Sequence, residues 1–467
     1  MLFNSLAFVV FFVVVTGVYF SLPAAKRWIW LLLASCFFYL CYVPWFILVI
    51  GTTIIIDYFA GIKISKSTGT QAKKWLVLSL IANLGILIVF KYAGFLTTNA
   101  NGLLSAIGLD LRFPLLELLL PLGLSFHTFQ AMSYNIEVYR GHQAPEYHFG
   151  RYALYVMFYP QMVAGPIERP QNLLPQLKNL PDFNYDNALV GLRLIFWGFF
   201  KKIMVADRAA LVSDPVFLNP HLYSSPHILM ATALFAFRIY CDFSGYTDIA
   251  RGCAKVMGID LMENFKQPYL STSVTEFWRR WHISLSTWFR DYLYIPLGGH
   301  SGSKLRMAMV LLFTFLISGL WHGADWKFVI WGGLNGVYIL VERWLKWPYW
   351  ASKLTWLRRI WVFALICISW IFFAAPDLNR AWQAIVELFN KPSFVYYGHK
   401  ELYKDCFYAL MGIVILKWVD WQIYSGKTLN NLLPKSVYLR WACYFILLWS
   451  ILLFGVWGEK QFIYFIF

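Results

Sequence analysis

The chain has 467 residues, of which 59% are hydrophobic, 20% aromatic and only 14% charged. Soluble globular proteins are about 45–50% apolar and about 25% charged, so this composition excludes a soluble enzyme, and it excludes disordered, collagen-like and disulfide-rich chains as well. The apolar residues form runs of about 17–25, the length of helix that crosses a membrane. We therefore expect an all-α polytopic membrane protein.

The formal net charge of +16 does not indicate nucleic-acid binding. The basic residues lie in short loops between apolar runs, where membrane topology and anionic lipid headgroups explain them better. The first charges, Lys26 and Arg27, follow the first apolar run instead of preceding it, unlike those of a cleaved signal peptide. We expect the N-terminus to lie outside, with membrane lipid as a partner and no nucleic acid.

Hydropathy predicts about twelve spanning segments in chain order. They are expected near 3–22, 29–41, 46–62, 75–95, 114–139, 189–207, 227–250, 307–322, 327–345, 360–376, 407–424 and 441–458. Two apolar stretches are typical of re-entrant or interfacial segments: 152–176, which is broken by prolines, and 265–299, which carries tryptophans and arginines. Because no repeat or long linker interrupts the chain, we predict one domain over 1–467.

His322 is the first candidate for chemistry, because it ends an uncharged apolar run. An ionisable group at membrane depth is a functional hypothesis by default, and desolvation would keep its imidazole neutral and able to take a proton. The structural alternative is a histidine at the membrane interface with Asp325 as its partner.

His282 lies among tryptophans and arginines in the string TEFWRRWHISLSTWFRDY. One interpretation is an interfacial helix with snorkelling arginines and a tryptophan belt. The other places Arg279, Arg280 and Arg290 around the phosphates of an anionic donor, with His282 polarising the reacting carbonyl.

Arg238 and Asp242 lie four residues apart in a spanning run, with Asp248 beyond them. This spacing predicts a structural ion pair that fixes helix packing, with a substrate passage as the alternative. His127 is similarly embedded, and packing against a kinked helix is its expected role.

The seven cysteines are scattered and most lie in or beside apolar runs, so buried thiols are expected rather than disulfides or metal ligands. No histidine spacing indicates a metal site, and no P-loop, GxGxxG or GxSxG motif is present.

Five strings occur in a specific order. They are PLGLSFHTFQAMSYNIEVYRG, FYPQMVAGPIERPQNLLPQL, YCDFSGYTDIARG, FWRRWHISLSTWFRDYLYIPLGG and SGLWHGADWKFVIWGGLNG. This series resembles the membrane-bound O-acyltransferase (MBOAT) family, most of all the branch with the alginate O-acetyltransferase membrane subunit and the D-alanyl transfer protein of teichoic acid modification. The resemblance extends to about residue 345, with its motif core over about 114–345, and more loosely to the end.

The resemblance implies a bowl of helices with re-entrant segments around a central chamber, in a bacterial inner membrane. It implies that His322 is catalytic, as a base or as an acyl-accepting residue, and that His282 lines the same chamber. The further residues expected to bind donor or substrate are Arg279, Arg280, Arg290, Trp278, Trp281, Trp321, Asp325 and Asn335.

The implied reaction moves an acyl group, expected to be acetyl, from a cytoplasmic thioester toward a polysaccharide hydroxyl outside, as in the O-acetylation of alginate. The donor would be acetyl-CoA or an acyl carrier protein thioester, with no bound cofactor. A separate extracytoplasmic polysaccharide O-acetyltransferase would be the partner, and the loop over about 377–406, with Phe394, Tyr396 and Tyr397, is a candidate docking site for it.

Two other functions remain open from the sequence. Intramembrane Arg238, Asp242 and Asp248 would suit a transporter or flippase for a polysaccharide precursor, although no inverted repeat is present. A lipid- or peptide-directed acyltransferase of the same family is the other alternative.

Overall fold

The computed structural model describes residues 1–109, 111–116, 118–163, 165–345, 354–390, 400–458 and 462–463, and these contain helices and no strands. Their contacts divide the chain into two compact units. Unit 1 comprises Met1–Leu192 and Ala250–Met262, and unit 2 comprises Arg193–Ile249 and Glu263–Phe467. The expectation of an all-helical protein is confirmed, and the single domain stays a prediction.

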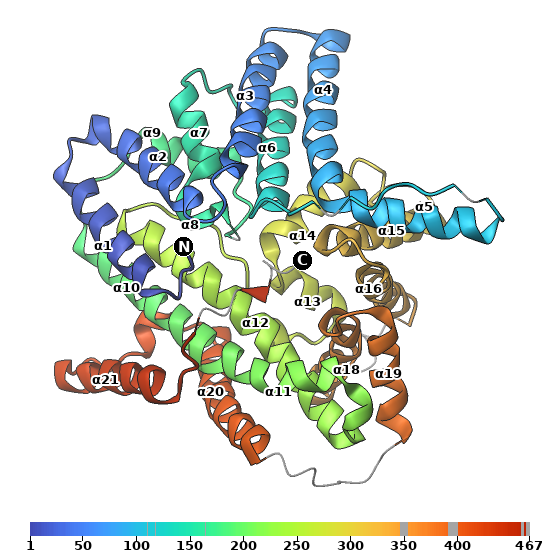
Figure 1. The fold of residues 1–467 in the computed structure, drawn as a ribbon. Coiled ribbons are helices and arrows are strands. Elements are labelled where there is room, and N and C mark those ends of the chain that lie inside the picture. The colour runs from blue at the N-terminus through green and yellow to red at the C-terminus, as the bar shows by residue number, and fades with distance from the viewer. Residues whose placement is uncertain are drawn as a thin grey trace. The chain divides into compact units, whose positions relative to one another are not determined.

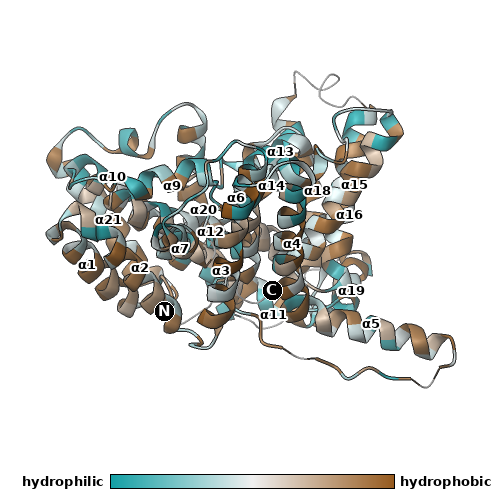
Figure 2. Ribbon diagram, turned by 90° about the horizontal axis from the view of Figure 1, so that it is seen from above, coloured by the Kyte–Doolittle hydropathy of each residue, from teal (hydrophilic) through white to brown (hydrophobic). Residues whose placement is uncertain are grey.

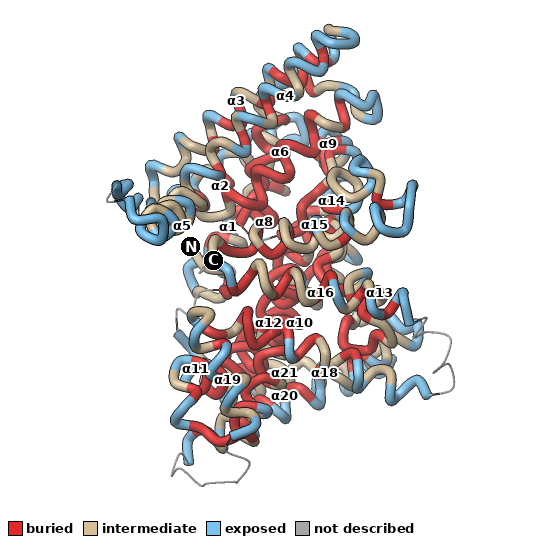
Figure 3. Tube along the Cα trace, turned by 90° about the vertical axis from the view of Figure 1, so that its right-hand side faces the viewer, coloured by how far each residue is buried: buried red, intermediate tan, exposed pale blue. Residues whose placement is uncertain are grey.

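Unit 1 is built on a bundle of α3, α4 and α6, which run side by side in Figure 1. Its helices are α1 (Leu6–Ser21), α2 (Ala24–Leu40), α3 (Phe46–Ser65), α4 (Gly69–Leu87), α5 (Ala93–Ala106), α6 (Leu124–Tyr139), α7 (Phe149–Met157), α8 (Tyr159–Met162) and α9 (Pro170–Lys178), with a π-helical turn, Ile88–Tyr92, between α4 and α5. In Figure 3, α6 is mostly buried.

Two long helices, α10 (Tyr185–Phe199) and α12 (Ser225–Val256), contribute residues to both units. In unit 2 the π-helix η2 (Phe200–Ala206) continues α10 into α11 (Asp207–Leu218). The other elements of unit 2 are η3 (Pro220–Leu222), η4 (Pro268–Leu270), α13 (Val274–Arg280), α14 (Ile283–Phe289), the π-helix η5 (Arg290–Tyr294), α15 (Lys304–His322), α16 (Trp326–Leu345), α18 (Thr355–Ala374), α19 (Leu378–Asn390), α20 (Lys400–Tyr424), η6 (Leu429–Leu432) and α21 (Val437–Phe454).

Within the described residues, seven helices are long and apolar enough to cross a membrane. They are Phe46–Ser65, Gly69–Ala106, Ser225–Val256, Lys304–His322, Thr355–Ala374, Lys400–Tyr424 and Val437–Phe454. Each of the twelve predicted segments overlaps a helix, but the number of spans is not confirmed. Figure 2 shows the hydrophobic colouring of α1 and α3.

The start of the segment predicted over 114–139 is wrong, because α6 begins only at Leu124. Gly123 precedes it with φ +75°, a left-handed conformation, and a Cβ there would lie 2.5 Å from the Met162 carbonyl oxygen. Only glycine tolerates both conditions, so this residue ends the irregular segment and starts the helix.

The stretch 152–176 is broken into short helices, as predicted, and the stretch 265–299 also consists of short helices. In the first, Pro160 and Pro170 occupy the opening turns of α8 and α9, where a missing N–H leaves no hydrogen bond unmade. The second contains η4, α13, α14 and η5, which carry part of the candidate site.

Unit 1 is held together by a buried carboxylate at the α3–α4–α6 interface. Asp57 is fully buried and accepts hydrogen bonds from Ser79 Oγ at 2.6 Å and from the Nδ2 atoms of Asn83 and Asn135 at 2.8 Å each. A polar group in an apolar bundle must find partners within the protein, so these bonds join three helices.

We predict that Asp57→Ala lowers the free energy of unfolding by about 1–3 kcal/mol, because it leaves three buried donors unsatisfied. Thermal unfolding of the purified protein in detergent micelles measures this loss. The matched control is Thr52→Ala, since Thr52 is exposed on the same helix and bonds only within it, to the Leu48 carbonyl. Equal destabilisation by the two variants would contradict the role given to Asp57.

Candidate active site

A cavity of about 490 Å³ lies in unit 2, lined by α13, α14, η5, α15 and α16. Its wall is mostly apolar, with Trp278, Phe289 and Phe315 among the lining side chains. Three arginines also line it, at positions 279, 290 and 343. An apolar cavity with a few convergent cations is suited to a ligand that has an uncharged arm and an anionic end.

One face of α15 leads from this cavity to His322. Leu311, Thr314 and Ser318 line the cavity at helical spacing, and His322 follows Ser318 by four residues. Residues spaced in this way lie on the same face of a helix. The His322 side chain, which is only 3% exposed, therefore continues the wall of the cavity toward the interior.

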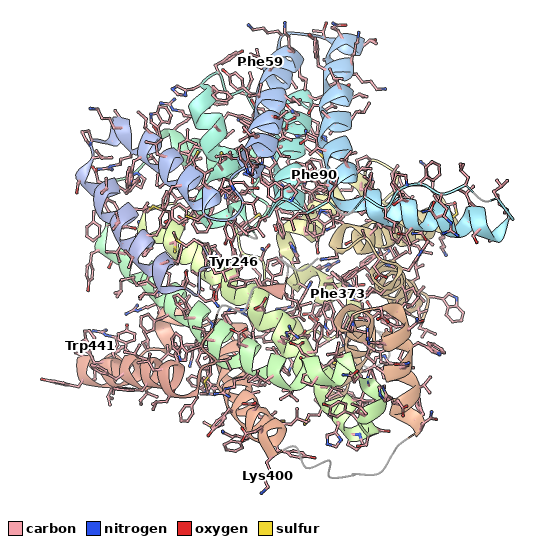
Figure 4. All side chains as sticks on the ribbon, in the orientation of Figure 1. Phe59, Phe90, Tyr246, Phe373, Lys400 and Trp441 are labelled. Atoms are coloured by element: carbon pink, nitrogen blue, oxygen red, sulfur yellow. The ribbon has the colours of Figure 1, made fainter. Side chains whose placement is uncertain are left out.

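Aromatic rings surround His322. The ring centroids of Trp321 and Trp331 each lie 5.0 Å from that of His322, and the Phe373 centroid lies at 5.6 Å (Phe373 is labelled in Figure 4). These rings exclude water from the surroundings of the imidazole, which is 3% exposed.

Close contact between α15 and α16 brings Trp331 to His322. A Cβ at Gly319 would lie 2.1 Å from the Phe328 carbonyl oxygen, and one at Gly332 would lie 2.2 Å from the Phe315 carbonyl oxygen. The two backbones touch there, so no side chain larger than hydrogen fits at either position.

His282 has an unusual backbone conformation, with φ +44° in the left-handed region, where non-glycine residues are uncommon. Asn264 holds the following turn, because its carbonyl accepts from the Ile283 N–H at 2.9 Å and its Oδ1 from the Ser284 N–H at 3.2 Å. Left-handed backbone at a buried polar residue is typical of functional sites.

The imidazole of His282 is 1% exposed, and its centroid lies 6.4 Å from that of His322 and 4.6 Å from that of Phe243. Burial lowers the pKa of His282 to about 3. At neutral pH the ring is uncharged and offers one N–H donor and one acceptor. The structure thus brings together the two histidines that the sequence singled out.

The helix α13 is fixed at its start by a serine hydroxyl and a carboxylate. Ser273 caps it by accepting from the Glu276 N–H at 3.0 Å, and Glu342 of α16 accepts from the Val274 N–H at 2.5 Å. Negative charge at a helix N-terminus is stabilising, so α13 is attached to α16 with a defined orientation. This orientation points Trp278 and Arg279 to the cavity.

Three of the residues expected to bind donor line the cavity: Trp278, Arg279 and Arg290. Arg279 forms no ion pair with any residue that the structure describes, whereas Arg290 Nε pairs with Asp291 at 2.7 Å. Arg280 does not line the cavity, because it pairs with Glu276 at 2.9 Å and lies over the ring of Tyr424.

Two other expected donor-binding residues, Trp281 and Trp321, are not among the residues that line the cavity. Trp281 is buried between Phe277 and Trp370, with centroids at 5.4 and 5.2 Å. Trp321 contacts His322, as described above. Their binding roles stay predictions.

Asp325 and Asn335 bond to neighbouring helix residues. Asp325, considered as a partner of His322, instead caps α16 by accepting from the Lys327 N–H at 2.9 Å. Asn335 is fully buried and accepts from Trp278 Nε1 at 3.3 Å. Asn335 thus contacts Trp278, which lines the cavity, and Asp325 caps the start of α16.

The predicted ion pair of Arg238 with Asp242 is wrong. Arg238 pairs with Asp214, whereas Asp242 pairs with Lys202 at 2.5 Å. Lys202 also pairs with Asp207 at 3.0 Å. Helix packing supplied nearer opposite charges from α11 and η2, and a spacing of four residues cannot reveal such partners.

Sequence reasoning missed several residues of the site. Arg343 is not among the predicted site residues, although its place at the end of α16 lets it line the cavity. Ser318 could have been found from its i, i+4 relation to His322. Trp331 and Asn264 gave no local signal, since only the fold brings them to the histidines.

The remaining candidates lie elsewhere or outside the described residues. His127 belongs to unit 1, where its Nε2 lies 2.5 Å from Thr53 Oγ1. All seven cysteines are free, and the described part of the chain contains no cluster suited to a metal ion. Phe394, Tyr396 and Tyr397 of the candidate docking loop lie outside the described residues.

Comparison with known proteins places the chain in a family. Residues 46–379 match the model of the membrane-bound O-acyltransferase family. The chain is 37% identical to the "probable alginate O-acetylase" of Azotobacter vinelandii over 84% of this chain and 78% of that protein. It is 36% identical to the peptidoglycan O-acetyltransferase of Helicobacter pylori over 82% and 79% of the two chains, and 28% identical to the teichoic acid D-alanyltransferase of Bacillus subtilis over 56% and 70%. The chain is thus a multi-pass membrane protein that belongs to the MBOAT family.

Proposed function

We propose that the chain is a membrane O-acetyltransferase that takes an acetyl group from a cytoplasmic thioester and passes it across the membrane for O-acetylation of an exported polysaccharide such as alginate. The observation that carries this proposal is the position of His322, one helical turn beyond a residue that lines the cavity. Relatives that are named as O-acetylases of alginate and peptidoglycan support the substrate class.

The chemistry requires a base that is uncharged before the reaction. His322 takes the proton of the acceptor's hydroxyl while the oxygen of that hydroxyl bonds to the carbonyl carbon of the thioester. The C–S bond then breaks, the proton passes to the departing thiolate, and an ester and a free thiol result. The N–H of neutral His282, or a backbone amide, stabilises the intermediate oxyanion.

The cavity suits the phosphopantetheine arm that acetyl-CoA and acyl carrier proteins share. Phosphate favours guanidinium partners, and Arg279, Arg290 and Arg343 supply them at the cavity wall. The apolar side chains suit the uncharged part of the arm. No cofactor is needed for this reaction, because the thioester is a co-substrate.

The acceptor reaches the acetyl group from the opposite side of a bacterial inner membrane, with the N-terminus outside. The partner that we propose is an extracytoplasmic polysaccharide O-acetyltransferase, which receives the acetyl group and esterifies the polymer. The candidate spans support a path across the membrane within one chain.

We predict that His322→Ala lowers the acetyl ester content of the exported polymer by at least about 100-fold, because general-base catalysis contributes roughly 10²–10⁴-fold. Acetyl ester is measured on purified polymer, and protein amount and membrane insertion are measured in parallel. The control is His221→Ala, since His221 is exposed and lies outside the cavity wall. Full acetylation by the His322 variant would contradict the catalytic assignment.

We also predict that Arg279→Ala and Arg343→Ala each raise the KM for acetyl-CoA by about 10-fold or more, since a hydrogen bond to a charged group contributes about 1.5–3 kcal/mol. Uptake of labelled acetyl groups by inside-out vesicles gives the KM. Arg280→Ala is the matched control, because Arg280 lies on the same helix but does not line the cavity. A larger shift for Arg280→Ala than for the other two variants would contradict donor binding in this cavity.

A further inference from the structure

The indole of Trp278 lies between the cavity and the catalytic candidate. Trp278 lines the cavity, and its ring centroid lies 5.6 Å from that of Trp331, whose own ring contacts His322. Neither Trp331 nor His322 is among the cavity-lining residues. The ring contacts from Trp278 through Trp331 to His322 therefore place the Trp278 indole on the side of the cavity wall that faces His322.

Two contacts fix the Trp278 ring in this place. Its Nε1–H donates to Asn335 Oδ1 at 3.3 Å, and its ring packs in a T-shaped arrangement with the ring of Phe315 at a centroid distance of 5.3 Å. Asn335 is fully buried, and its Nδ2 donates to the Trp331 carbonyl at 2.8 Å. The amide group of Asn335 thus bonds to the side chain of Trp278 and to the backbone of Trp331.

We propose that Trp278, positioned by Asn335, sets the length of the acyl group and restricts the enzyme to acetyl. This inference rests on the proposed function and adds a specificity determinant to it. An acetyl group carries a single methyl beyond the carbonyl carbon. A longer chain would have to displace an indole that is held by a hydrogen bond and packed between two aromatic rings.

The position of Trp278 on α13 differs from that of Leu311, a lining residue of α15. Leu311 precedes His322 by eleven residues, which is about 16 Å along a helix at 1.5 Å per residue. Shortening Leu311 enlarges the cavity far from His322, whereas shortening Trp278 enlarges it beside Trp331, whose ring contacts His322. Leu311→Ala therefore separates the effect of cavity size from that of position.

The test compares S-acetyl and S-hexanoyl 4′-phosphopantetheine, labelled in the acyl group, with inside-out vesicles from cells that express the full chain. We expect wild type to prefer acetyl strongly. In Trp278→Ala the ratio of kcat/KM for acetyl over hexanoyl should fall by about 10-fold or more, because each methylene that a pocket admits or rejects changes kcat/KM by roughly 10–200-fold. Leu311→Ala should leave that ratio within about threefold of wild type.

Two further variants test the role of Asn335 and guard against misfolding of Trp278→Ala. Trp278→Phe keeps an aromatic ring but has no N–H, and Asn335→Ala removes the acceptor. Each should lower the acetyl preference by a smaller factor, and the double variant should lower it no further, because both remove the same bond. If Asn335 had only a structural role, Asn335→Ala would reduce the rates with the acetyl and the hexanoyl thioester in equal proportion.

The outcomes distinguish the two proposals. If Trp278→Ala folds and keeps the acetyl preference of wild type, the role of Trp278 is overturned and the proposed function stays intact. If Trp278→Ala does not fold, an unchanged preference in both Trp278→Phe and Asn335→Ala has the same consequence. Failure of wild-type vesicles to take up acetyl from the thioester, with folded protein present, overturns the proposed function and this inference with it.

Discussion

The contact between the imidazole of His322 and the indole of Trp331 is the interaction on which the site depends. It exists because α15 and α16 meet backbone to backbone at Gly319 and Gly332. Bulkier residues would separate the helices and open the aromatic surroundings that keep the imidazole dry. In the function that we propose, this imidazole takes a proton from the hydroxyl of the acceptor. Packing at two glycines therefore sets the surroundings of the imidazole that we propose as the catalytic base.

The sequence predicted the larger features well, because they follow from hydropathy and helix-breaking residues. The helices and the interrupted stretch around 152–176 agree with the structure. The family resemblance implied that His282 and His322 lie near each other, and their ring centroids are 6.4 Å apart. Family resemblance identified the histidines more specifically than their burial did. The start of α6 was misplaced, since an apolar run does not reveal that Gly123 adopts a left-handed conformation beside the Met162 carbonyl.

Tertiary partners could not be predicted from spacing. Arg238 and Asp242 share a helix face, yet each pairs with a residue of another element, because a buried charge takes the nearest opposite charge in three dimensions. Arg280 and Arg279 are adjacent in the chain, and only Arg279 lines the cavity. Asn264, which holds the left-handed turn at His282, is eighteen residues away from it and carries no motif of its own.

The most direct test of the account is an experimental structure of the full chain with a non-cleavable analogue, S-acetonyl-coenzyme A, in which a methylene separates the sulfur from the carbonyl. The account predicts that the phosphates lie at Arg279 and Arg343 and that the carbonyl lies between Trp278 and His322, within hydrogen-bonding reach of the imidazole. An analogue bound outside the cavity of α13–α16, or bound there with its carbonyl turned away from His322, would contradict it.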